Sequence, residues 1–388
     1  MKIFTVLVLT LAFIGGLVYR NVTSRPEVVT YTVHDPQQEA RILHDRAKQW
    51  LLGFQKENGL FHYQINPRTG AYATTNNELR QLMASRVLAL EAENDPSFLP
   101  AHEKNMQFVF DTWYQEQDGK GYILYEGKSK LGSNAMLLRS LVASPHFTEY
   151  KEKARATAEG ILFLMNENGS FRAWLDEPDY EYDEDYLLTF YSGEALLALM
   201  EYYEKVGDER TLARATKAGD FYINRYVTEM EKYYYPAYVP WMTLALEKLY
   251  EKTNDIKYTD AIFAMNDKLL ELQDTTLYKG RFYNPKTPQY GSPHSSSDAV
   301  FTEGLIHAWD LAKKGGDRER EEKYFNAIVL ALGNLATLQY REPVEAFPAD
   351  PKTYIGAIRF NADSWGTRID CAQHLIDGLS HYLSISSN

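Results

Sequence analysis

A short phrase that ends helices recurs along this 388-residue chain, and the repeat constrains the fold more than any other feature. Each full copy joins an apolar helix tail, a polar Asn-Gly or Asp-Gly break, and an aromatic residue that begins a short extended segment. The six helix ends lie near 55–61, 115–122, 166–171, 226–235, 271–278 and Gln339. The first three copies are clear, 271–278 is looser, and the other two ends lack the glycine. Ends spaced roughly 45 to 65 residues apart indicate a repeat architecture.

The chemistry of the phrase explains why it stops a helix. Asn or Asp followed by Gly supplies the left-handed backbone conformation that ends helices, and the same pair favours a tight turn. Six such units of two helices each predict an all-α fold, a closed (α/α)6 toroid of six helical hairpins. An open helical solenoid is the alternative, but no polar terminal repeat that would cap a solenoid is visible.

Apolar residues spaced near 3.6 predict the twelve helices of this ring. The segments are 36–57, 76–93, 97–117, 131–143, 147–167, 189–206, 209–226, 237–253, 256–273, 296–314, 317–340 and 366–384. The even-numbered helices are expected to be the inner ones. Strand signal is weak, and 122–125, 171–175 and 354–360 are expected to form only small hairpins in the connections.

Composition and charge bound the domain count and the partners. The chain is 45% hydrophobic, and no Pro-, Gly- or Ser-rich linker divides residues 26–388, which indicates one large domain. The net charge is −12, and no basic cluster could neutralise phosphates, which argues against a nucleic-acid partner. The 29 tyrosines include candidate stacking platforms for sugar rings, although packing is the commoner role of any single tyrosine.

Residues 1–25 form a separate element. Lys2 precedes an apolar run from Ile3 to Tyr19, after which Arg20 and Arg25 follow. The run suits a short membrane span or the hydrophobic region of a secretory signal, and no small-x-small cleavage site stands out. We expect an N-terminal hydrophobic helix that anchors the domain outside the cytoplasm, with a buried helix as the alternative.

The chain has one cysteine, Cys371. An intramolecular disulfide is therefore impossible, and a cysteine-based zinc cluster is excluded. Cys371 falls inside the last predicted helix, where a buried structural thiol is expected. No metal or cofactor is predicted.

An acidic stretch from Asp176 to Asp185 is the first candidate site. Crowded carboxylates raise one another's pKa, which a general acid requires, and they could also bind calcium. A solvated loop before a helix is the simpler reading. The interleaved Tyr180, Tyr182 and Tyr186 favour a functional role, because a merely solvated loop does not need them.

The phrase from Tyr290 to Asp298 is the second candidate, because it places His294 and Asp298 at a helix start, where both could face a pocket. Helix capping is the alternative role for Asp298 or the serines before it. Glu303 and His307, one turn apart on the same helix, are more often a structural pair.

The last helix is the third candidate. Asp370, Gln373, His374 and Asp377 fall at i, i+3, i+4 and i+7 and form one polar stripe behind Arg368. The stripe faces either solvent or the central cavity. Because inner helices of a hairpin ring run parallel, all three candidate segments are expected to converge on one mouth of the ring.

The hairpins, the turns and the segment from Tyr191 to Tyr203 together resemble the six-hairpin glycosidase superfamily over nearly all of residues 36–386. Members of that superfamily hydrolyse, cleave or epimerise sugars, commonly with a carboxylate or a histidine at the funnel mouth. The toroid of terpene cyclases and protein prenyltransferases is a rival with similar turns. The zinc ligands of the prenyltransferases have no counterpart, because Cys371 is isolated.

The resemblance implies a carbohydrate substrate, and the favoured reaction is glycosidic cleavage by two carboxylates. Asp298 and Asp185 are the predicted catalytic pair, and Asp370 is a third candidate. The predicted substrate-binding residues are His294, Arg368, His374, Tyr191, Trp241 and Trp365. Arg368 would suit an acidic sugar. The alternative function is a non-catalytic toroid that binds a polysaccharide or a protein partner in envelope assembly.

Overall fold

A computed structural model describes residues 31–176 and 180–386. The predicted N-terminal hydrophobic helix, Ile3 to Tyr19, lies outside these residues and stays a prediction. Within the described ranges, no helix is both long and apolar enough to cross a bilayer.

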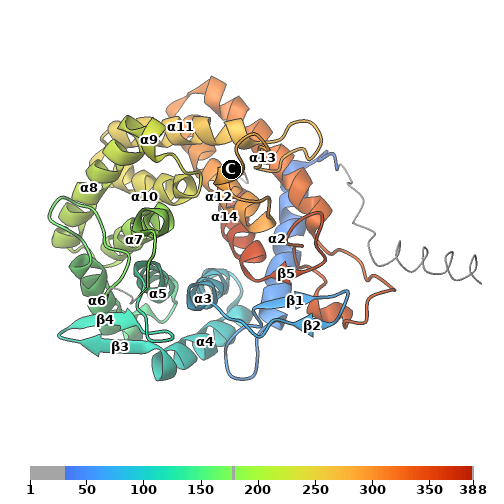
Figure 1. Ribbon diagram of the computed structural model, residues 1–388, viewed down its shortest axis with the longest axis horizontal. Helices are drawn as coiled ribbons and strands as arrows, with labels where there is room; N and C mark the ends of the chain where they lie inside the picture. Colours follow the sequence, from blue (N-terminus) through green and yellow to red (C-terminus); the bar gives the residue numbers. More distant parts are fainter. Residues whose placement is uncertain (1–30, 177–179, 387–388) are drawn as a thin grey trace, which may run out of the picture.

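The described residues form a ring of outer and inner helices, as the turn phrases predict (Figure 1). The outer helices are α2 (Pro36–Gly53), α4 (Leu99–Thr112), α6 (Phe147–Phe163), α8 (Glu209–Ile223), α11 (Lys257–Leu269) and α13 (Arg318–Leu338). The inner helices are α3 (Glu78–Ala92), α5 (Leu131–Ala143), α7 (Glu184–Val206), α10 (Tyr238–Thr253), α12 (Ser295–Gly315) and α14 (Asp370–Ser386). A short α9 (Met230–Tyr233), which the sequence analysis did not predict, follows the π-helical turn η2 (Asn224–Thr228).

Contacts between the helices show that the ring is closed. Each inner helix packs on the next, and α14 packs back on α3. Among the outer helices, α13 returns to α2. An open solenoid is therefore excluded, and the inner helices are buried on nearly all sides because neighbours, outer partners and the ring interior surround them.

Strands are confined to the connections. A hairpin joins β3 (Tyr114–Gln117) to β4 (Lys120–Ile123), so the predicted helix 97–117 ends earlier than expected. A three-stranded sheet of β2 (Ala71–Tyr72), β1 (Gln64–Asn66) and β5 (Thr367–Arg368), all antiparallel, was not predicted. It ties the first hairpin connection to the last one and so positions the start of α14 beside the start of α3.

The recurring turns hold neighbouring outer helices together. Gly280 has a φ of +93°, and a Cβ there would lie 1.9 Å from the carbonyl oxygen of Leu330 on α13. Gly59, Gly169 and Gly356 have the same left-handed conformation and the same close approach to the following outer helix. A glutamine spans each such contact in the first and last copies: Gln55 Nε2 donates to Ala101 O at 2.7 Å, and Gln339 Nε2 donates to Leu43 O at 3.0 Å. The phrase is therefore a helix stop and an inter-repeat clamp.

We expect Gly280→Ala to destabilise the fold by about 2 to 4 kcal/mol, because the methyl group would overlap the α13 backbone in a turn that already disfavours a side chain. Gly316→Ala is the matched control. Gly316 has a φ of +72° with no atom within 4 Å of an added Cβ, so about 1 kcal/mol is expected. Urea unfolding of both variants measures the difference, and equal losses would contradict the clamp.

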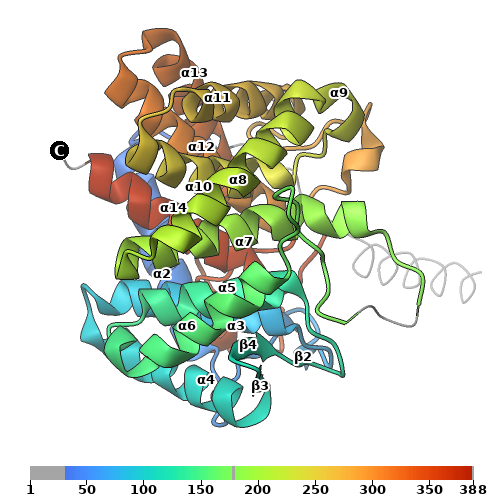
Figure 2. The ribbon, with the colours of Figure 1, turned by 90° about the vertical axis from the view of Figure 1, so that its left-hand side faces the viewer.

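All six inner helices run in the same direction. Figure 2 shows the ring from the side, with the C-terminal end of α14 at the left and the start of α7 towards the right. We name the end where the inner helices begin the N-terminal mouth, and the end where they finish the C-terminal mouth. Asn77, Asp183 and His294 accept backbone hydrogen bonds as side-chain caps at three of these starts.

Candidate active site at the N-terminal mouth

Arg80 is the centre of a charged cluster at the N-terminal mouth. It lies in the first turn of α3, where Asn77 accepts a hydrogen bond from its backbone N–H at 3.0 Å. Its Nε is 2.8 Å from Asp370 Oδ2 at the start of α14, and its guanidinium contacts the ring and hydroxyl of Tyr63. Arg368 adds a bidentate pair to Asp370, with both N···O distances 2.6 Å. Asp370 is therefore held in one orientation by two guanidinium groups.

These contacts decide the charge of Asp370. The residue is 3% exposed, and burial raises its pKa, but Arg80 and Arg368 outweigh burial and hold the pKa at about 2. Asp370 is consequently an ionised carboxylate at neutral pH, with both of its oxygens directed by cations.

Glu194 on α7 has the opposite protonation state. It is also 3% exposed, and burial raises its pKa to about 8 against the opposing charges of Arg139 and Arg80. Its Oε2 has no hydrogen-bond partner among the described residues. A Cβ at Gly132 would lie 2.6 Å from this oxygen and 2.4 Å from Tyr191, so a glycine on α5 makes room for both side chains.

Arg80 connects the two carboxyl groups. Its charge lowers the pKa of Asp370 and also acts on Glu194, so both lie within its electrostatic reach. One carboxyl is protonated at neutral pH and the other is ionised. Two carboxyls whose environments push their pKa values apart form the usual arrangement of a general acid and a general base.

A histidine–glutamate pair lies deeper in the ring. His374 Nδ1 is 2.8 Å from Glu303 Oε2, and its ring meets Trp241 edge-on with centroids 5.3 Å apart. Burial and the nearby Asp377 raise the pKa of Glu303. A carboxyl that holds one ring nitrogen fixes the orientation of the other, as in catalytic histidine pairs. The guanidinium of Arg139, which acts on Glu194 and Glu303, lies 5.7 Å from the Trp241 ring.

His294 completes the mouth. Its Nδ1 caps α12 by accepting from Ser297 N–H at 3.0 Å, and its ring stacks on Phe360 at 5.2 Å. Burial lowers the pKa of His294 to about 4, although Asp370 opposes the shift. Arg368 also contacts Phe360, at 4.8 Å, so His294 and Arg368 share this aromatic support. The starts of α12 and α14 therefore meet, as predicted.

Six of the nine predicted site residues come together in this way. They are Asp370, His294, Arg368, His374, Tyr191 and Trp241. Asp370 and His374 face the ring interior, so the stripe on α14 is a wall of the interior and not a solvated face.

The structure places Asp298 elsewhere. Its Oδ1 accepts from Phe282 N–H and its Oδ2 accepts from Asn334 Nδ2, both at 2.8 Å. Gln81 and Asn134 accept from the backbone of Phe61 and Ile123 in the same manner at the starts of α3 and α5. Asp298 thus belongs to a repeated contact between the start of an inner helix and the turn before it. This structural role is closer to the helix-capping alternative than to the predicted catalytic role.

Two further predicted residues lie outside the Arg80 cluster. The Asp185 side chain is 68% exposed and pairs with Arg225 at 2.7 Å on the rim of the mouth. Trp365 packs edge-on against Phe347 at 5.4 Å, and its carbonyl accepts a hydrogen bond from Tyr340. Within the described residues, no interaction joins Asp185 to Asp298, so these two do not form the predicted pair.

Asp298→Ala is expected to cost about 2 to 4 kcal/mol of stability, because the buried Phe282 N–H and the Asn334 amide lose their acceptor. Burial raises the pKa of Asp298 to about 7, so the folded state keeps a proton that the unfolded state releases, and wild-type stability falls as pH rises from about 4 to 7. Asp298→Asn has no proton to lose at this position. Its free energy of unfolding, relative to that of wild type, should therefore rise by on the order of 2 to 4 kcal/mol between pH 4 and pH 8. Urea unfolding at both pH values tests it, and an unchanged difference would contradict the burial argument.

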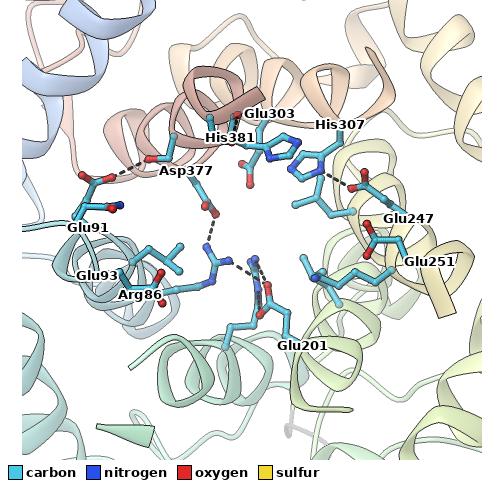
Figure 3. A pocket seen from close by; sticks show the side chains of 18 of the residues that line it. Arg86, Glu91, Glu93, Glu201, Glu247, Glu251, Glu303, His307, Asp377 and His381 are labelled. Carbon is cyan, nitrogen blue, oxygen red and sulfur yellow. Dashed lines mark hydrogen bonds and ion pairs between the residues drawn. The ribbon is translucent and has the colours of Figure 1, made fainter. Parts of the chain in front are cut away.

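The C-terminal mouth has a separate cavity of about 470 Å³ (Figure 3). A belt of buried charges crosses it: Glu201 accepts from Arg139 at 2.9 and 3.0 Å and from Arg86 at 3.1 Å, and Arg86 also pairs with Asp377. We name Arg86, Arg139, Glu201 and Asp377 the charge belt. Across the cavity the rings of His307 and His381 stack at 4.1 Å, and His307 pairs with Glu247.

Arg80, Arg139, Glu194 and Glu201 are not among the site residues predicted from the sequence. Glu194 and Glu201 are one heptad apart in the segment from Tyr191 to Tyr203, and this spacing was the available signal. Arg139 stands between apolar residues and a serine on α5, and Arg80 stands in the polar first turn of α3, so only the ring shows what these arginines contact.

Comparisons with known proteins identify the fold. No family model and no curated protein sequence matches the chain. A solved D-mannose isomerase superposes on 89% of this chain and 97% of its own, with a TM-score of 0.66 at 11% identity. Cellobiose 2-epimerase from Bacillus thermoamylovorans superposes on 88% of this chain and 99% of its own, with a TM-score of 0.63 at 11% identity. A GH76 α-mannanase from Bacteroides thetaiotaomicron superposes on 91% of this chain and 100% of its own, with a TM-score of 0.62 at 13% identity.

At such low identity these likenesses concern the fold. They extend over nearly the whole length of each protein, so the helical ring is shared in full and not in part. The chain has the (α/α)6 toroid fold that these solved structures share, the fold that its helix-ending phrases predict.

Proposed function

We propose that this protein is a carbohydrate-active enzyme that hydrolyses glycosidic bonds at the N-terminal mouth. The main support is that one guanidinium, that of Arg80, forms an ion pair with the ionised Asp370 and also acts electrostatically on the protonated Glu194. Glu194 would be the general acid and Asp370 the general base.

In the proposed reaction the bond between the anomeric carbon and the glycosidic oxygen breaks. Glu194 donates its proton to the leaving oxygen, and its unpartnered Oε2 is free of competing bonds within the described structure. A water molecule attacks the anomeric carbon, and Asp370 accepts the proton of that water. Arg80 and Arg368 hold Asp370 in position, and Trp241 and Tyr191 supply aromatic faces for sugar rings.

Fold neighbours support a sugar substrate but not a shared pair of catalytic residues. A Salegentibacter α-1,6-mannanase is inactive when two consecutive aspartates are changed to asparagine, and it was solved with α-1,6-mannotriose. This chain contains no two consecutive aspartates. The proposed acid and base instead lie on two different helices, Glu194 on α7 and Asp370 on α14.

A second candidate reaction is isomerisation or epimerisation of a sugar by proton transfer. The observation that favours it is the His374–Glu303 pair, which orients one ring nitrogen of His374, while the other ring nitrogen has no hydrogen-bond partner among the described residues. Two fold neighbours, the D-mannose isomerase and the cellobiose 2-epimerase, interconvert sugars.

Incubation with oligosaccharides in D2O separates the two reactions. Hydrolysis creates new reducing ends without deuterium on sugar carbons, whereas proton transfer at carbon incorporates solvent deuterium that NMR detects. Suitable substrates are α-1,6-mannotriose, cellobiose and heparin-derived disaccharides. New reducing ends that depend on both Glu194 and Asp370 support hydrolysis. Carbon-bound deuterium that depends on His374 would refute hydrolysis and support isomerisation or epimerisation. If neither product forms, the remaining hypothesis is a toroid that binds its ligand without catalysis.

We further propose that residues 1–25 tether the domain to a membrane, outside the cytoplasm, because Ile3 to Tyr19 is a largely apolar run without a charged residue. Removal of residues 1–25 is expected to yield a soluble, folded protein with the stability of the full chain. Cell fractionation and thermal unfolding of the two forms test this, and loss of folding on truncation would instead indicate a buried helix.

A further inference from the structure

A row of tyrosines on the rim of the N-terminal mouth takes no part in the proposed mechanism. Tyr186 lies in the first turn of α7, Tyr235 follows α9, and Tyr290 lies in the turn before α12. The centroids of Tyr186 and Tyr235 are 5.6 Å apart and those of Tyr235 and Tyr290 are 6.0 Å apart, both edge-to-face. We name these three residues the tyrosine row. Tyr186 is 46% exposed, so the row presents aromatic surface to solvent.

A cavity of about 190 Å³ opens beside the row. Tyr186, Tyr233 and Tyr235 line it together with the ion pair of Asp185 and Arg225. The guanidinium of Arg225 lies 4.0 Å from the Tyr233 ring and is thereby held in place. The exposed carboxylate of Asp185 stays accessible to a ligand. The cavity thus combines aromatic walls with a fixed donor and an accessible acceptor.

This combination fits a sugar ring better than other ligands. Aromatic walls pack against the C–H faces of a pyranose, while its hydroxyls can both donate to Asp185 and accept from Arg225. A free anion would compete with Asp185 for Arg225, and a metal ion is disfavoured because the described residues contain no cluster of three metal-binding side chains. The volume is below the roughly 300 Å³ of sites for larger ligands, which suits a single ring.

The position of the cavity relates it to the proposed active site. Asp185 and Glu194 lie on the same helix, α7, separated by roughly 14 Å along its axis. The tyrosine row leads through Tyr290 towards His294, which lies beside Asp370 and Arg368. A chain of sugar units could therefore extend from the mouth to the rim.

We propose that the tyrosine row and its cavity form an outlying sugar subsite, so that the substrate is an oligosaccharide or polysaccharide and not a single sugar. The inference rests on the proposed function for its catalytic meaning, but sugar binding at the rim stands independently of catalysis. It also assigns a role to Asp185 that differs from the predicted catalytic one: Asp185 binds a distant sugar unit.

The test is affinity electrophoresis of the full chain in gels that contain a soluble mannan, hydroxyethyl cellulose or heparin. All proteins carry Glu194→Gln to prevent turnover. We expect at least one polysaccharide to retard the parent protein, and Tyr186→Ala and Tyr235→Ala to weaken the apparent Kd about tenfold, equivalent to 1.4 kcal/mol. Tyr203→Ala, at the other end of α7, is the matched control and should leave retardation unchanged. Retardation by none of the three, or equal retardation of all variants, overturns the subsite.

A kinetic measurement keeps this inference separate from the proposed function. In the active protein, Tyr186→Ala should raise KM for a tetrasaccharide about tenfold and leave that for a disaccharide unchanged. If polysaccharide binding depends on the tyrosines while no sugar is cleaved, the subsite stands and the hydrolase proposal fails. If cleavage depends on Glu194 and Asp370 while the tyrosine variants keep wild-type binding and KM, the subsite alone fails.

Discussion

Glu194→Gln is expected to reduce kcat for glycoside hydrolysis by about 10²- to 10⁴-fold, because glutamine cannot donate a proton to the leaving oxygen. Asp370→Asn should reduce kcat by a similar factor, because an amide cannot accept the proton of the attacking water. The pKa of about 8 for Glu194 predicts that wild-type activity falls as pH rises through 8, where the acid ionises. Reducing-end assays between pH 5 and pH 10 measure both effects.

Glu251→Gln is the matched control, since it makes the same chemical change at the C-terminal mouth and should leave kcat unaltered. The pH dependence of unfolding shows whether the variant is folded and whether Glu194 ionises as expected. The raised pKa of Glu194 means that wild-type stability falls between about pH 4.5 and pH 8, a loss that the glutamine variant lacks. A Glu194→Gln protein that retains full kcat, or that loses activity only by unfolding, would contradict the assignment.

Glu201→Gln is expected to lower the free energy of unfolding by about 3 to 5 kcal/mol, because Arg86 and Arg139 would remain in the interior with too little negative charge. Burial raises the pKa of Glu201, but Arg139 and Arg86 outweigh it and bring the pKa to about 2. The stabilisation is therefore fully present above about pH 4.5 and is lost as pH falls towards 2. Urea unfolding at pH 7 and pH 3 measures its size and its pH dependence.

A surface ion pair provides the comparison for this variant. Glu271 and Lys268 are 2.6 Å apart, but their side chains are 63% and 40% exposed, so Glu271→Gln should cost less than about 1 kcal/mol. Similar losses for the two glutamine variants would show that the charge belt is well solvated and would refute its structural role.

Much of the fold could be predicted from the sequence because its signals are local. The Asn-Gly and Asp-Gly stops, the 3.6-residue spacing and the capping residues act over a few residues, and all twelve predicted helices are present. The unpredicted three-stranded sheet depends on pairing partners that are distant in the chain. The strands Gln64–Asn66 and Thr367–Arg368 are too short to be recognised alone, and their antiparallel pairing joins residues about 300 positions apart in the sequence.

The site could be predicted only in part, for a related reason. The α14 stripe was found because Asp370 and His374 lie one turn apart on the same helix. Asp298 was selected because it stands in a polar phrase, yet its partners Phe282 and Asn334 use it as a clamp. Proximity in the sequence indicates which side chains share a face, but not what that face meets.

The sequence by itself determined the helices, their stops, the hairpin count and the mouth at which the inner helices begin, because these follow from backbone preferences and periodicity. Only the tertiary structure decided the roles of the carboxyl groups. Glu194, Asp298 and Asp370 are all buried acids on inner helices, and burial raises the pKa of each. The pKa of Asp370 alone falls below its usual value, because Arg80 and Arg368 form direct ion pairs with it, whereas no such pair reaches Glu194 or Asp298 within the described residues. Arg368 precedes Asp370 by two residues, but Arg80 comes from α3, and closure of the ring is what brings it to the start of α14.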